Sequence, residues 1–212
     1  MPSAKSVVIS CAGIGSRLGL GQTKALIKIN GRSLISWQLE AFKDVEDLRI
    51  VIGYQANDVI NEVLQYRSDV IFVYNHRYFE TKTGASFFLG AQHANEYVLA
   101  WDGDLLVHPE DVKRILNEDS EFICYADITS DEAVFVNTLE NGDVVSFSRE
   151  QGDYEWTGPA CIKKENLQYS SGNVFNQLEP HLPMKGMKVR AYDIDTYQDY
   201  ERVVEYVKEW YK

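Results

Sequence analysis

The sequence predicts an α/β fold built on a mixed, mostly parallel sheet that is flanked by helices. From residue 6 to residue 117, short apolar segments of strand length alternate with helical segments of about ten residues. Strands that alternate with helices form parallel sheets with right-handed crossover connections. After residue 120 several strand-like segments follow one another, which predicts a smaller β-rich part.

The first half of the chain supplies the predicted parallel strands and their helices. The expected strands are residues 6–10, 48–52, 70–74 and 97–101. The expected helices are one capped by Ser33 that carries Ile35, Leu39 and Phe42, one capped by Asn57, residues 84–94, and one that begins at Pro109 and runs to about residue 117. Ser and Asn are favourable N-caps, and Pro is favourable in the first helical turn.

The second half supplies the β-rich part. The expected strands are residues 122–126, 133–138, 144–148, 156–162 and 188–194. A short helix is expected near residues 173–178, and a final helix from about Tyr197 has apolar residues at helical spacing. Asn141-Gly142 lies between two strand-like segments and predicts a hairpin.

Composition and charge exclude several classes of protein. The 212 residues include 21 basic and 32 acidic side chains, a net charge of −11. This balance argues against a nucleic-acid-binding surface, which needs clustered cations. Three scattered cysteines fit a reducing compartment. The sequence has no signal-like apolar stretch and no apolar run of about 18 residues, so we expect a cytoplasmic protein without a membrane partner.

A glycine-rich loop follows the first predicted strand, at residues 13–19. Ligands of parallel sheets bind at the carboxyl ends of the strands, and glycines let backbone N–H groups approach an anion. The loop has neither the P-loop pattern nor the dinucleotide pattern. It holds Arg17, and Lys24 follows closely. Two cations beside such a loop suit a triphosphate. The alternatives are a simple turn and two solvent-facing cations.

Two acidic segments are candidate metal ligands. Asp102 and Asp104 end a predicted strand, and two carboxylates with this spacing can share a hard cation such as Mg²⁺. A turn also uses Asp-Gly-Asp. Asp193 and Asp195 share one face of a predicted strand, although Asp195 is equally suited to cap the last helix.

These segments resemble a known family. The loop AGIGSRLGLGQTKAL (residues 12–26) and the following LIKINGRSLI resemble the signature of the nucleotidyltransferases that make sugar nucleotides and related activated alcohols. The stretch YDIDTYQDY (residues 192–200) is most similar to the bacterial choline-phosphate cytidylyltransferase branch. The resemblance implies a Rossmann-like fold of the nucleotide-diphospho-sugar transferase type. It also implies one domain over residues 1–212, with a nucleotide-binding half (about 1–118) and an acceptor-binding half (about 119–212).

The implied reaction is Mg²⁺-dependent nucleotidyl transfer. A nucleoside triphosphate, with CTP favoured, would give its nucleoside monophosphate to a small phosphorylated acceptor and release pyrophosphate. Phosphocholine-like compounds, phosphonates and sugar phosphates are the candidate acceptors. A homodimer is compatible with the sequence, and no nucleic-acid partner is expected.

The site residues follow from the matched motifs. The expected catalytic residues are Arg17 and Lys24, and the expected metal ligands are Asp104, Asp195 and, in support, Asp193. The expected nucleotide-binding residues are Ala12, Gly13, Gly15, Ser16, Thr83, Ser86 and Asp102; Thr83 and Ser86 are equally suited to cap a helix.

The expected acceptor-binding residues are Tyr154, Glu155 and Trp156. Tyr154 and Trp156, with Trp101 and Tyr78, are candidates for an aromatic cage around a quaternary ammonium; the alternative is that these aromatics belong to the core.

Two other functions share these features. A metal-dependent glycosyltransferase would bind a nucleotide sugar through Asp102-Gly103-Asp104, but it would not need Arg17 and Lys24. A non-catalytic nucleotide-binding regulator would have no need to keep Lys24 or Asp104, and both are present.

Overall fold

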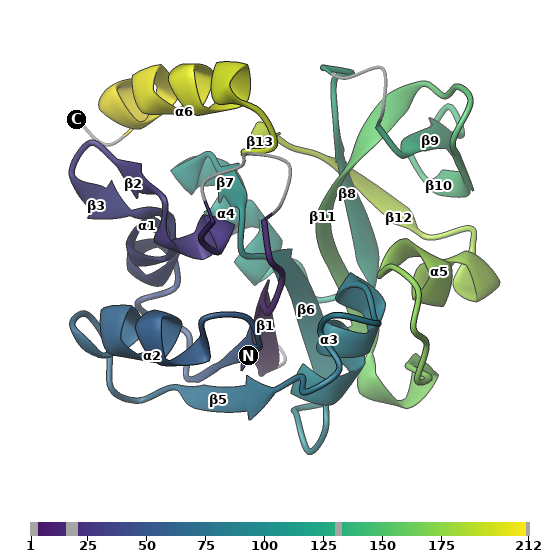
Figure 1. The fold of residues 1–212 in the computed structure, drawn as a ribbon. Coiled ribbons are helices and arrows are strands. Elements are labelled where there is room, and N and C mark those ends of the chain that lie inside the picture. The colour runs from purple at the N-terminus through teal and green to yellow at the C-terminus, as the bar shows by residue number, and fades with distance from the viewer. Residues whose placement is uncertain (1–3, 16–20, 130–132, 211–212) are drawn as a thin grey trace.

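The computed structural model describes residues 4–15, 21–129 and 133–210, and a nine-stranded sheet runs through this part of the chain (Figure 1). Its strands lie in the order β10-β9-β11-β6-β1-β4-β5, while β8 pairs with both β11 and β12. The sheet is mixed and flanked by helices, so the predicted fold class is confirmed.

The first half forms the parallel part of the sheet. The parallel strands are β1 (Lys5–Cys11), β4 (Asp47–Ile52), β5 (Ile71–Tyr74) and β6 (Tyr97–Asp102). The helices between and after them are α1 (Leu34–Ala41), α2 (Ala56–Leu64), α3 (Thr83–Gly90) and α4 (Pro109–Asn117). This is the predicted alternation, and it brings the carboxyl ends of β1 and β6 side by side.

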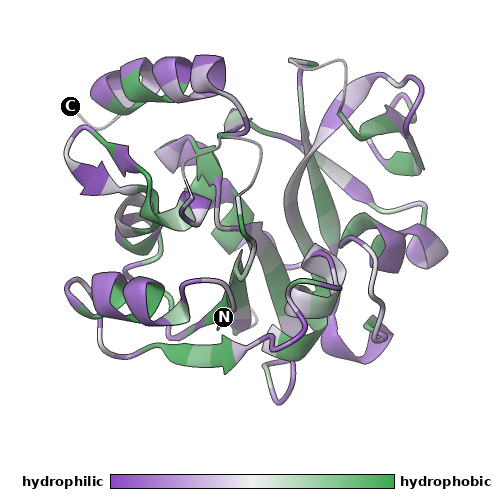
Figure 2. Cartoon of the chain, viewed as in Figure 1, coloured by the Kyte–Doolittle hydropathy of each residue, from purple (hydrophilic) through white to green (hydrophobic). Residues whose placement is uncertain are grey.

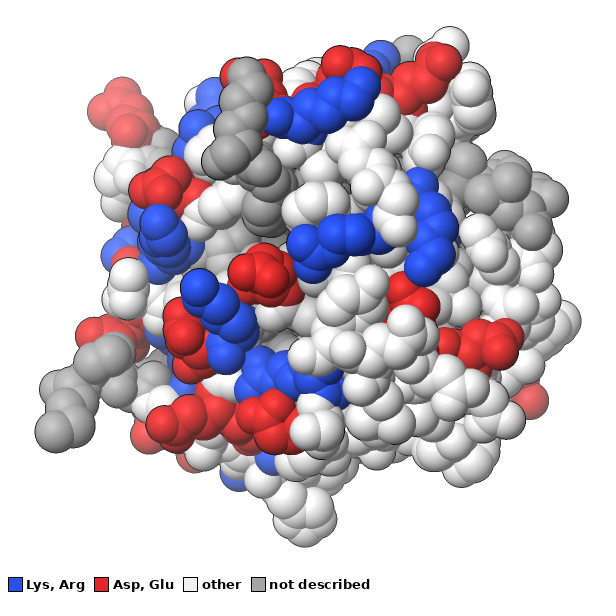
Figure 3. All heavy atoms as spheres, turned by 90° about the vertical axis from the view of Figure 1, so that its left-hand side faces the viewer, with Lys and Arg blue, Asp and Glu red and all other residues white. Residues whose placement is uncertain are grey.

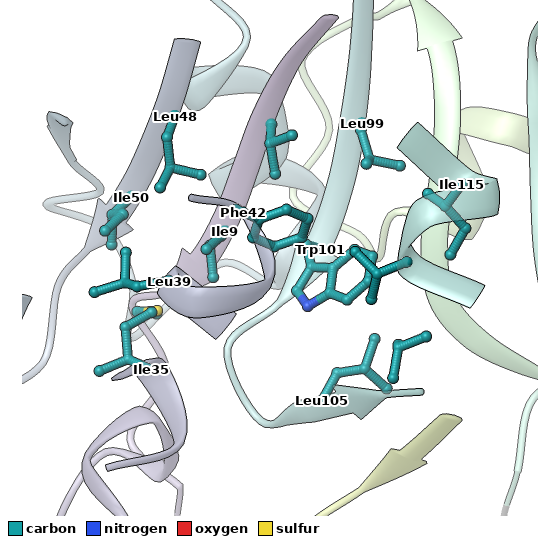
Figure 4. Packing of buried hydrophobic residues seen from close by; sticks show 14 of the residues in the cluster. Ile9, Ile35, Leu39, Phe42, Leu48, Ile50, Leu99, Trp101, Leu105 and Ile115 are labelled. Carbon is teal, nitrogen blue, oxygen red and sulfur yellow. The ribbon is translucent and has the colours of Figure 1, made fainter. Parts of the chain in front are cut away.

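Alternating side chains of β1 fill the two sides of the sheet. Val7 and Ile9 pack in one cluster with residues of α1, α2 and α4, whereas Val8 packs in another with residues of α3. In the first cluster, Trp101 meets Phe42 edge-on, with ring centroids 4.8 Å apart (Figure 4). The strands are accordingly apolar, while the helices carry polar residues on their outer sides (Figure 2). Burial on both faces explains why these strands are nearly continuous apolar runs.

The second half extends the sheet mainly with antiparallel strands. Its elements are β8 (Phe122–Ala126), β9 (Phe135–Thr138), β10 (Val144–Ser148), β11 (Tyr154–Lys163), α5 (Phe175–Leu178) and β12 (Lys185–Lys188). The long strand β11 pairs antiparallel with β6, β8 and β9 and so joins the two halves. The predicted hairpin is confirmed between β9 and β10, with Gly142 at a φ of +88° in the turn.

Several helix boundaries test the predictions directly. The Ser33 hydroxyl accepts a hydrogen bond from the Ser36 amide and caps α1, as predicted. The prediction that Asn57 caps α2 is wrong, because α2 begins at Ala56, directly after Gln55 in the left-handed conformation. The helix predicted over residues 84–94 already ends at Gly90.

The single strand predicted over residues 188–194 is also wrong. The chain instead leaves β12 at Lys188 and forms β13 (Ala191–Asp193), which pairs with the short strand β7 (Leu105–Val107) in a separate sheet. Arg190 lies between the two strands, and both its backbone N–H and its Nε donate to the carboxylate of Asp111. The buried carboxylate of Asp111 thus fixes the segment at Arg190 where the chain passes from one sheet to the other.

The final helix α6 (Tyr197–Trp210) lies over a small hairpin made by β2 (Lys28–Ile29) and β3 (Arg32–Ser33) (Figure 1). Val203 and Val207 of α6 are buried against Ile29 and Trp37. This packing holds the start of α6, and with it residues 193–195, beside the segment that contains Lys24 (Figure 1).

No helix in the described ranges is long and apolar enough to cross a membrane. On the face that Figure 3 presents, acidic and basic side chains lie interspersed, without a broad basic patch. This face has none of the clustered positive charge that nucleic-acid binding requires.

Candidate active site

A cavity of about 600 Å³ lies at the carboxyl ends of β1 and β6 and continues along the β-rich half of the molecule. It brings together most of the predicted site residues that the structure describes. Those that line it are Ala12, Gly13, Lys24, Thr83, Ser86, Asp102, Asp104, Glu155, Trp156, Asp193 and Asp195.

Lys24 lies at the centre of the charged part of this cavity. It begins a short 3-10 turn (Lys24–Leu26), and the residue is only 9% exposed. Its Nζ donates to Asp104 Oδ2 at 2.7 Å and also to Asp195 Oδ1. Burial alone would lower the pKa of Lys24, but the charges of Asp104 and Asp195 outweigh burial and raise that pKa. Lys24 therefore stays protonated and links residues from both halves of the chain.

The Asp-Gly-Asp segment is held by two elements, β1 and α1. Gly103 N donates to Ser10 O at 3.1 Å, and a Cβ at Gly103 would lie 2.8 Å from Cys11 Sγ. From α1, the buried side chain of Gln38 donates to Asp102 O at 2.9 Å and to Leu105 O at 2.7 Å. The segment forms a turn, which was the alternative to a metal site, and contacts with β1 and α1 fix the position of this turn.

Asp102 is half-buried beside β11. Gly158 of β11 has a φ of +101°, and a Cβ there would lie 2.5 Å from Asp102 Oδ2, so only glycine leaves room for this carboxylate. Burial, followed by the nearby charge of Asp104, raises the pKa of Asp102 to about 7. Asp102 is thus a carboxyl group that protonates near neutral pH.

The second acidic pair reaches the site through β13. Ile194 N donates to Asp104 O at 3.1 Å, which places Asp193 and Asp195 next to the first acidic segment. Asp193 lines the wall of the cavity. Its enclosure there and the charges of Asp104 and Asp102 raise the pKa of Asp193.

Asp195 is not the N-cap of α6. Thr196 and Asp199 cap the helix reciprocally: Thr196 N and Oγ1 each donate to Asp199 Oδ2 at 2.8 Å, and Asp199 N donates to Thr196 Oγ1. The Asp195 carboxylate is turned toward Lys24 instead. The capping alternative is therefore wrong.

The acidic residues fit a hard divalent cation. Asp102, Asp104, Asp193 and Asp195 supply only oxygen donors, the type that Mg²⁺ prefers. Burial first, and the charges of the neighbouring carboxylates second, raise the pKa values of Asp102 and Asp193. Asp104 and Asp195 already share one cation, the Lys24 ammonium. In the described part of the chain, no three acidic, His or Cys side chains yet converge on one metal position. A cation between Asp104 and Asp195 therefore requires Lys24 to give up these contacts.

The glycine loop is described in part. Ala12 and Gly13 line the cavity. Gly15 does not; its φ is +67°, and a Cβ there would lie 2.9 Å from Gln22 O and 3.1 Å from Lys24 Cγ, so it makes room for the Lys24 segment. The predicted residues Ser16 and Arg17 lie outside the described residues.

Thr83 and Ser86 line the cavity from α3. The position that caps this helix is Lys82, without a side-chain capping bond, so the capping alternative for Thr83 and Ser86 is wrong. Ser86 Oγ accepts from Asn75 Nδ2 at 3.1 Å, and Thr83 Oγ1 accepts from Val174 N at 3.4 Å. The sequence analysis missed Asn75, which also lines the cavity. It follows β5 directly, and a polar residue at the end of a parallel strand is the same signal that identified Asp102.

The acceptor-side predictions are partly wrong. Glu155 and Trp156 line the cavity, but Tyr154 stacks on Tyr125, with centroids 4.6 Å apart, away from the lining. Trp101 is buried in the core against Phe42. The four-residue aromatic cage therefore does not form, although Tyr78 does line the cavity.

Residues 7–154 match a protein family described as the MobA-like NTP transferase domain. The chain belongs to this family. The predicted enzyme class, nucleotidyltransferase, is thereby confirmed, and the site described above is the active-site candidate of an NTP transferase. The matched range ends before β13, so the family match does not include Asp193 and Asp195.

Individual NTP transferases are similar over nearly the whole chain. The choline-phosphate cytidylyltransferase of Streptococcus pneumoniae is 25% identical over 95% of this chain and 97% of its own. Two solved structures share the fold. One, a CTP:phosphocholine cytidylyltransferase from Streptococcus pneumoniae, has a TM-score of 0.76 and 19% identity over 96% of this chain and 99% of that one. The other, an inositol-1-phosphate CTP transferase from T. maritima, has a TM-score of 0.77 and 20% identity over 99% and 98%.

Proposed function

We propose that this NTP transferase joins a cytidine monophosphate, taken from CTP, to a small phosphorylated acceptor and releases pyrophosphate with the help of Mg²⁺. The observation that carries the proposal is the Lys24 ammonium held between Asp104 and Asp195 at the strand ends. CTP is supported by relatives whose names specify cytidylyl or CTP transfer.

The reaction needs no general base. A phosphate on the acceptor is largely ionised at neutral pH, so one of its oxygens can attack the α-phosphorus of the nucleotide directly. A new P–O bond forms there while the bond from the α-phosphorus to the bridging oxygen breaks, and pyrophosphate leaves with that electron pair. Alignment of the two phosphates and neutralisation of their charge provide the rate acceleration.

The residues of the chain divide this work. The backbone at Ala12 and Gly13 lies where the triphosphate would pass, and Thr83 and Ser86 face the cavity as partners for the nucleoside. Lys24 is charged and stabilises the negative charge that grows on the leaving pyrophosphate. Asp104 and Asp195 would hold Mg²⁺, with Asp193 and Asp102 close by; the bound ion would add Lewis-acid stabilisation of phosphate oxygens.

The test is pyrophosphate release measured across CTP, UTP, GTP, ATP and dTTP. Each nucleotide is paired with phosphocholine, 2-aminoethylphosphonate, glycerol phosphate and several sugar 1-phosphates, with Mg²⁺ or with EDTA. We expect release only with CTP, one class of acceptor and Mg²⁺. Asp104→Asn should abolish it, whereas Asp44→Asn, an exposed acid outside the cavity, should not.

Two results would contradict the proposal. One is release that continues unchanged in EDTA or in Asp104→Asn. The other is silence over the whole panel together with release of a nucleoside diphosphate from a nucleotide sugar, which would assign Asp102 and Asp104 to a glycosyltransferase.

A further inference from the structure

The β-rich wall of the cavity carries a cation that the nucleotide-binding residues do not use. Arg149 follows β10, is exposed and lines the cavity. Its guanidinium carbon lies 5.4 Å from the centroid of the Phe175 ring. Among residues 4–15, 21–129 and 133–210, no acidic side chain forms an ion pair with Arg149. The sequence analysis did not single it out.

Three other described cations line the same cavity, but they lie on other parts of its wall than Arg149. Lys24 is bound by Asp104 and Asp195. Arg202 lies 3.8 Å from the carboxylate of Asp199 on α6. Lys82 precedes α3, beside the residues assigned to the nucleoside. Arg149 lies on the remaining wall, which Trp156 of β11 and Phe175 of α5 also line. Among the described residues it is the cation of that wall.

The carboxylate on this wall is already engaged. Glu155 accepts hydrogen bonds from Thr129 N at 2.8 Å and from Thr129 Oγ1 at 2.9 Å, one on each of its oxygens. It therefore holds the segment at Thr129 and makes no ion pair with Arg149 in the described part of the chain. The guanidinium of Arg149 is left without an acidic partner among these residues, although the wall as a whole also carries the charge of Glu155.

An aromatic cluster supports the arginine. Phe147 lies 5.6 Å from Trp156 and 5.4 Å from Phe175, centroid to centroid, and Trp156 and Phe175 both line the cavity. A guanidinium over a ring keeps its in-plane N–H donors available for an anion. Packing thus restrains Arg149 without using its hydrogen-bonding capacity.

We propose that Arg149 is an acceptor-binding residue that pairs with an anionic oxygen group of the acceptor. This inference rests on the proposed function, because it takes the β-rich wall as the acceptor side. The group is either the phosphate of the acceptor or a separate carboxylate at its far end. Both would accept two N–H donors from the guanidinium.

The experiment uses three variants of the full chain. Arg149→Met keeps a side chain that can pack on Phe175 but removes the charge, and Arg149→Lys keeps the charge without the fork of donors. Arg77→Met is the matched control, since Arg77 pairs with Glu80 on the surface outside the cavity lining. The acceptor probes are glycerol 1-phosphate, phosphocholine and 3-phosphoglycerate, the last of which adds a carboxylate.

Loss of a charged hydrogen-bonding partner predicts a rise of about tenfold to a hundredfold in the acceptor KM of Arg149→Met. The CTP KM should stay within about twofold, and Arg149→Lys should recover part of the loss. An equal rise for all three probes assigns Arg149 to the acceptor phosphate. A rise for 3-phosphoglycerate alone assigns it to a carboxylate.

A binding measurement keeps this test separate from the test of the proposed function. Calorimetric titration of the three probes, with Mg²⁺ and α,β-methylene-CTP present, needs no turnover. Weaker binding in Arg149→Met but not in Arg77→Met supports the assignment even if no pyrophosphate is ever released. Equal affinity of wild type and Arg149→Met, or no binding of any probe to the wild type, overturns it.

Discussion

At the scale of single residues, Lys24 is the counter-ion of an acidic site. Asp104 and Asp195 bond directly to its ammonium, and Asp102 and Asp193 lie close by. The Lys24 ammonium neutralises part of the negative charge of the acidic residues. Under the proposed function it also supplies a positive charge to the phosphates. Removing it should therefore change both stability and catalysis.

Lys24→Met should lower pyrophosphate release by about two orders of magnitude or more, the usual cost of losing a group that stabilises transition-state charge. In EDTA its thermal midpoint should fall below that of wild type, because the partly buried carboxylates of Asp104 and Asp195 lose their partner. Added Mg²⁺ should raise the midpoint of the variant more than that of wild type. Lys113→Met, which removes an exposed ion pair with Glu110, is the control and should behave like wild type. Normal turnover in Lys24→Met would contradict the assignment.

Asp102 predicts a pH dependence of stability. Its folded-state pKa of about 7 lies above the ordinary value of an Asp carboxyl, so the folded protein holds this proton more tightly than the unfolded chain. The stabilisation is complete below about pH 4 and is lost as the pH rises through about 7. In metal-free buffer, the free energy of unfolding of wild type minus that of Asp102→Asn should therefore decrease from pH 5 to pH 8.5. Urea titrations at several pH values measure this difference, and a constant or rising difference would refute the assignment.

At the scale of elements, the acidic turn depends on α1. Helix α1 contributes no residue to the cavity lining, yet Gln38 donates to the carbonyl groups of Asp102 and Leu105 on either side of the turn. The capped start of α1 at Ser33 and its packing beneath the sheet thus fix the position of two acidic side chains.

Gln38→Leu should destabilise the fold by about 2 kcal/mol, because two buried carbonyl groups lose their donors. The Mg²⁺ concentration needed for half-maximal pyrophosphate release should rise, since the turn is held less firmly. Gln65→Leu, at the exposed end of α2, is the matched control. Urea unfolding and Mg²⁺ titrations provide the two measurements. An unchanged Mg²⁺ requirement in a destabilised Gln38→Leu would make the role of Gln38 purely structural.

At the scale of the whole molecule, the cavity is formed by both halves of the chain. Ala12, Lys24 and Asp104 come from the first half, and Trp156 and Asp195 come from the second. A ligand that fills this cavity contacts both halves and stabilises them together.

CTP with Mg²⁺ should therefore raise the thermal midpoint. At a ligand concentration of 100 times Kd, the stabilisation is about 2.7 kcal/mol, or roughly 5–10 °C for a chain of this size. Asp104→Asn should show a much smaller shift at the same concentrations. Differential scanning calorimetry at several CTP concentrations measures it, and a midpoint independent of CTP would contradict nucleotide binding in this cavity.

The sequence predicted those site residues whose position follows from the ends of the parallel strands. Asp102 and Asp104 were found because they end a strand, and the carboxyl ends of parallel strands meet at one edge. The same reasoning could have rejected Trp101, which shares a face of β6 with the core residue Leu99. Lys24 was found because it closely follows the glycine loop and matches the family signature. Arg149 had no such signal, because it follows an antiparallel strand of the β-rich half and only the tertiary fold brings it to the cavity.

The final strand was harder to predict for a physical reason. A segment of seven residues that alternates like one strand is divided between two sheets, and the division depends on Arg190 meeting the distant Asp111. The partner strand β7 is only three residues long, so its sequence is too short to show the alternation of apolar residues that would identify it as a strand. Contacts between residues far apart in the chain therefore decide where this strand ends and which sheet it joins.

The position of Asp195 late in the chain has a consequence for synthesis on the ribosome. A nascent chain that has emerged only as far as β11 already carries the glycine loop, Lys24 and Asp104, but it lacks the second carboxylate that Lys24 binds. The proposed active centre is therefore completed only when β13 docks beside β7. Polypeptides released early by a stop codon or a stalled ribosome would have no complete centre with which to consume nucleotide.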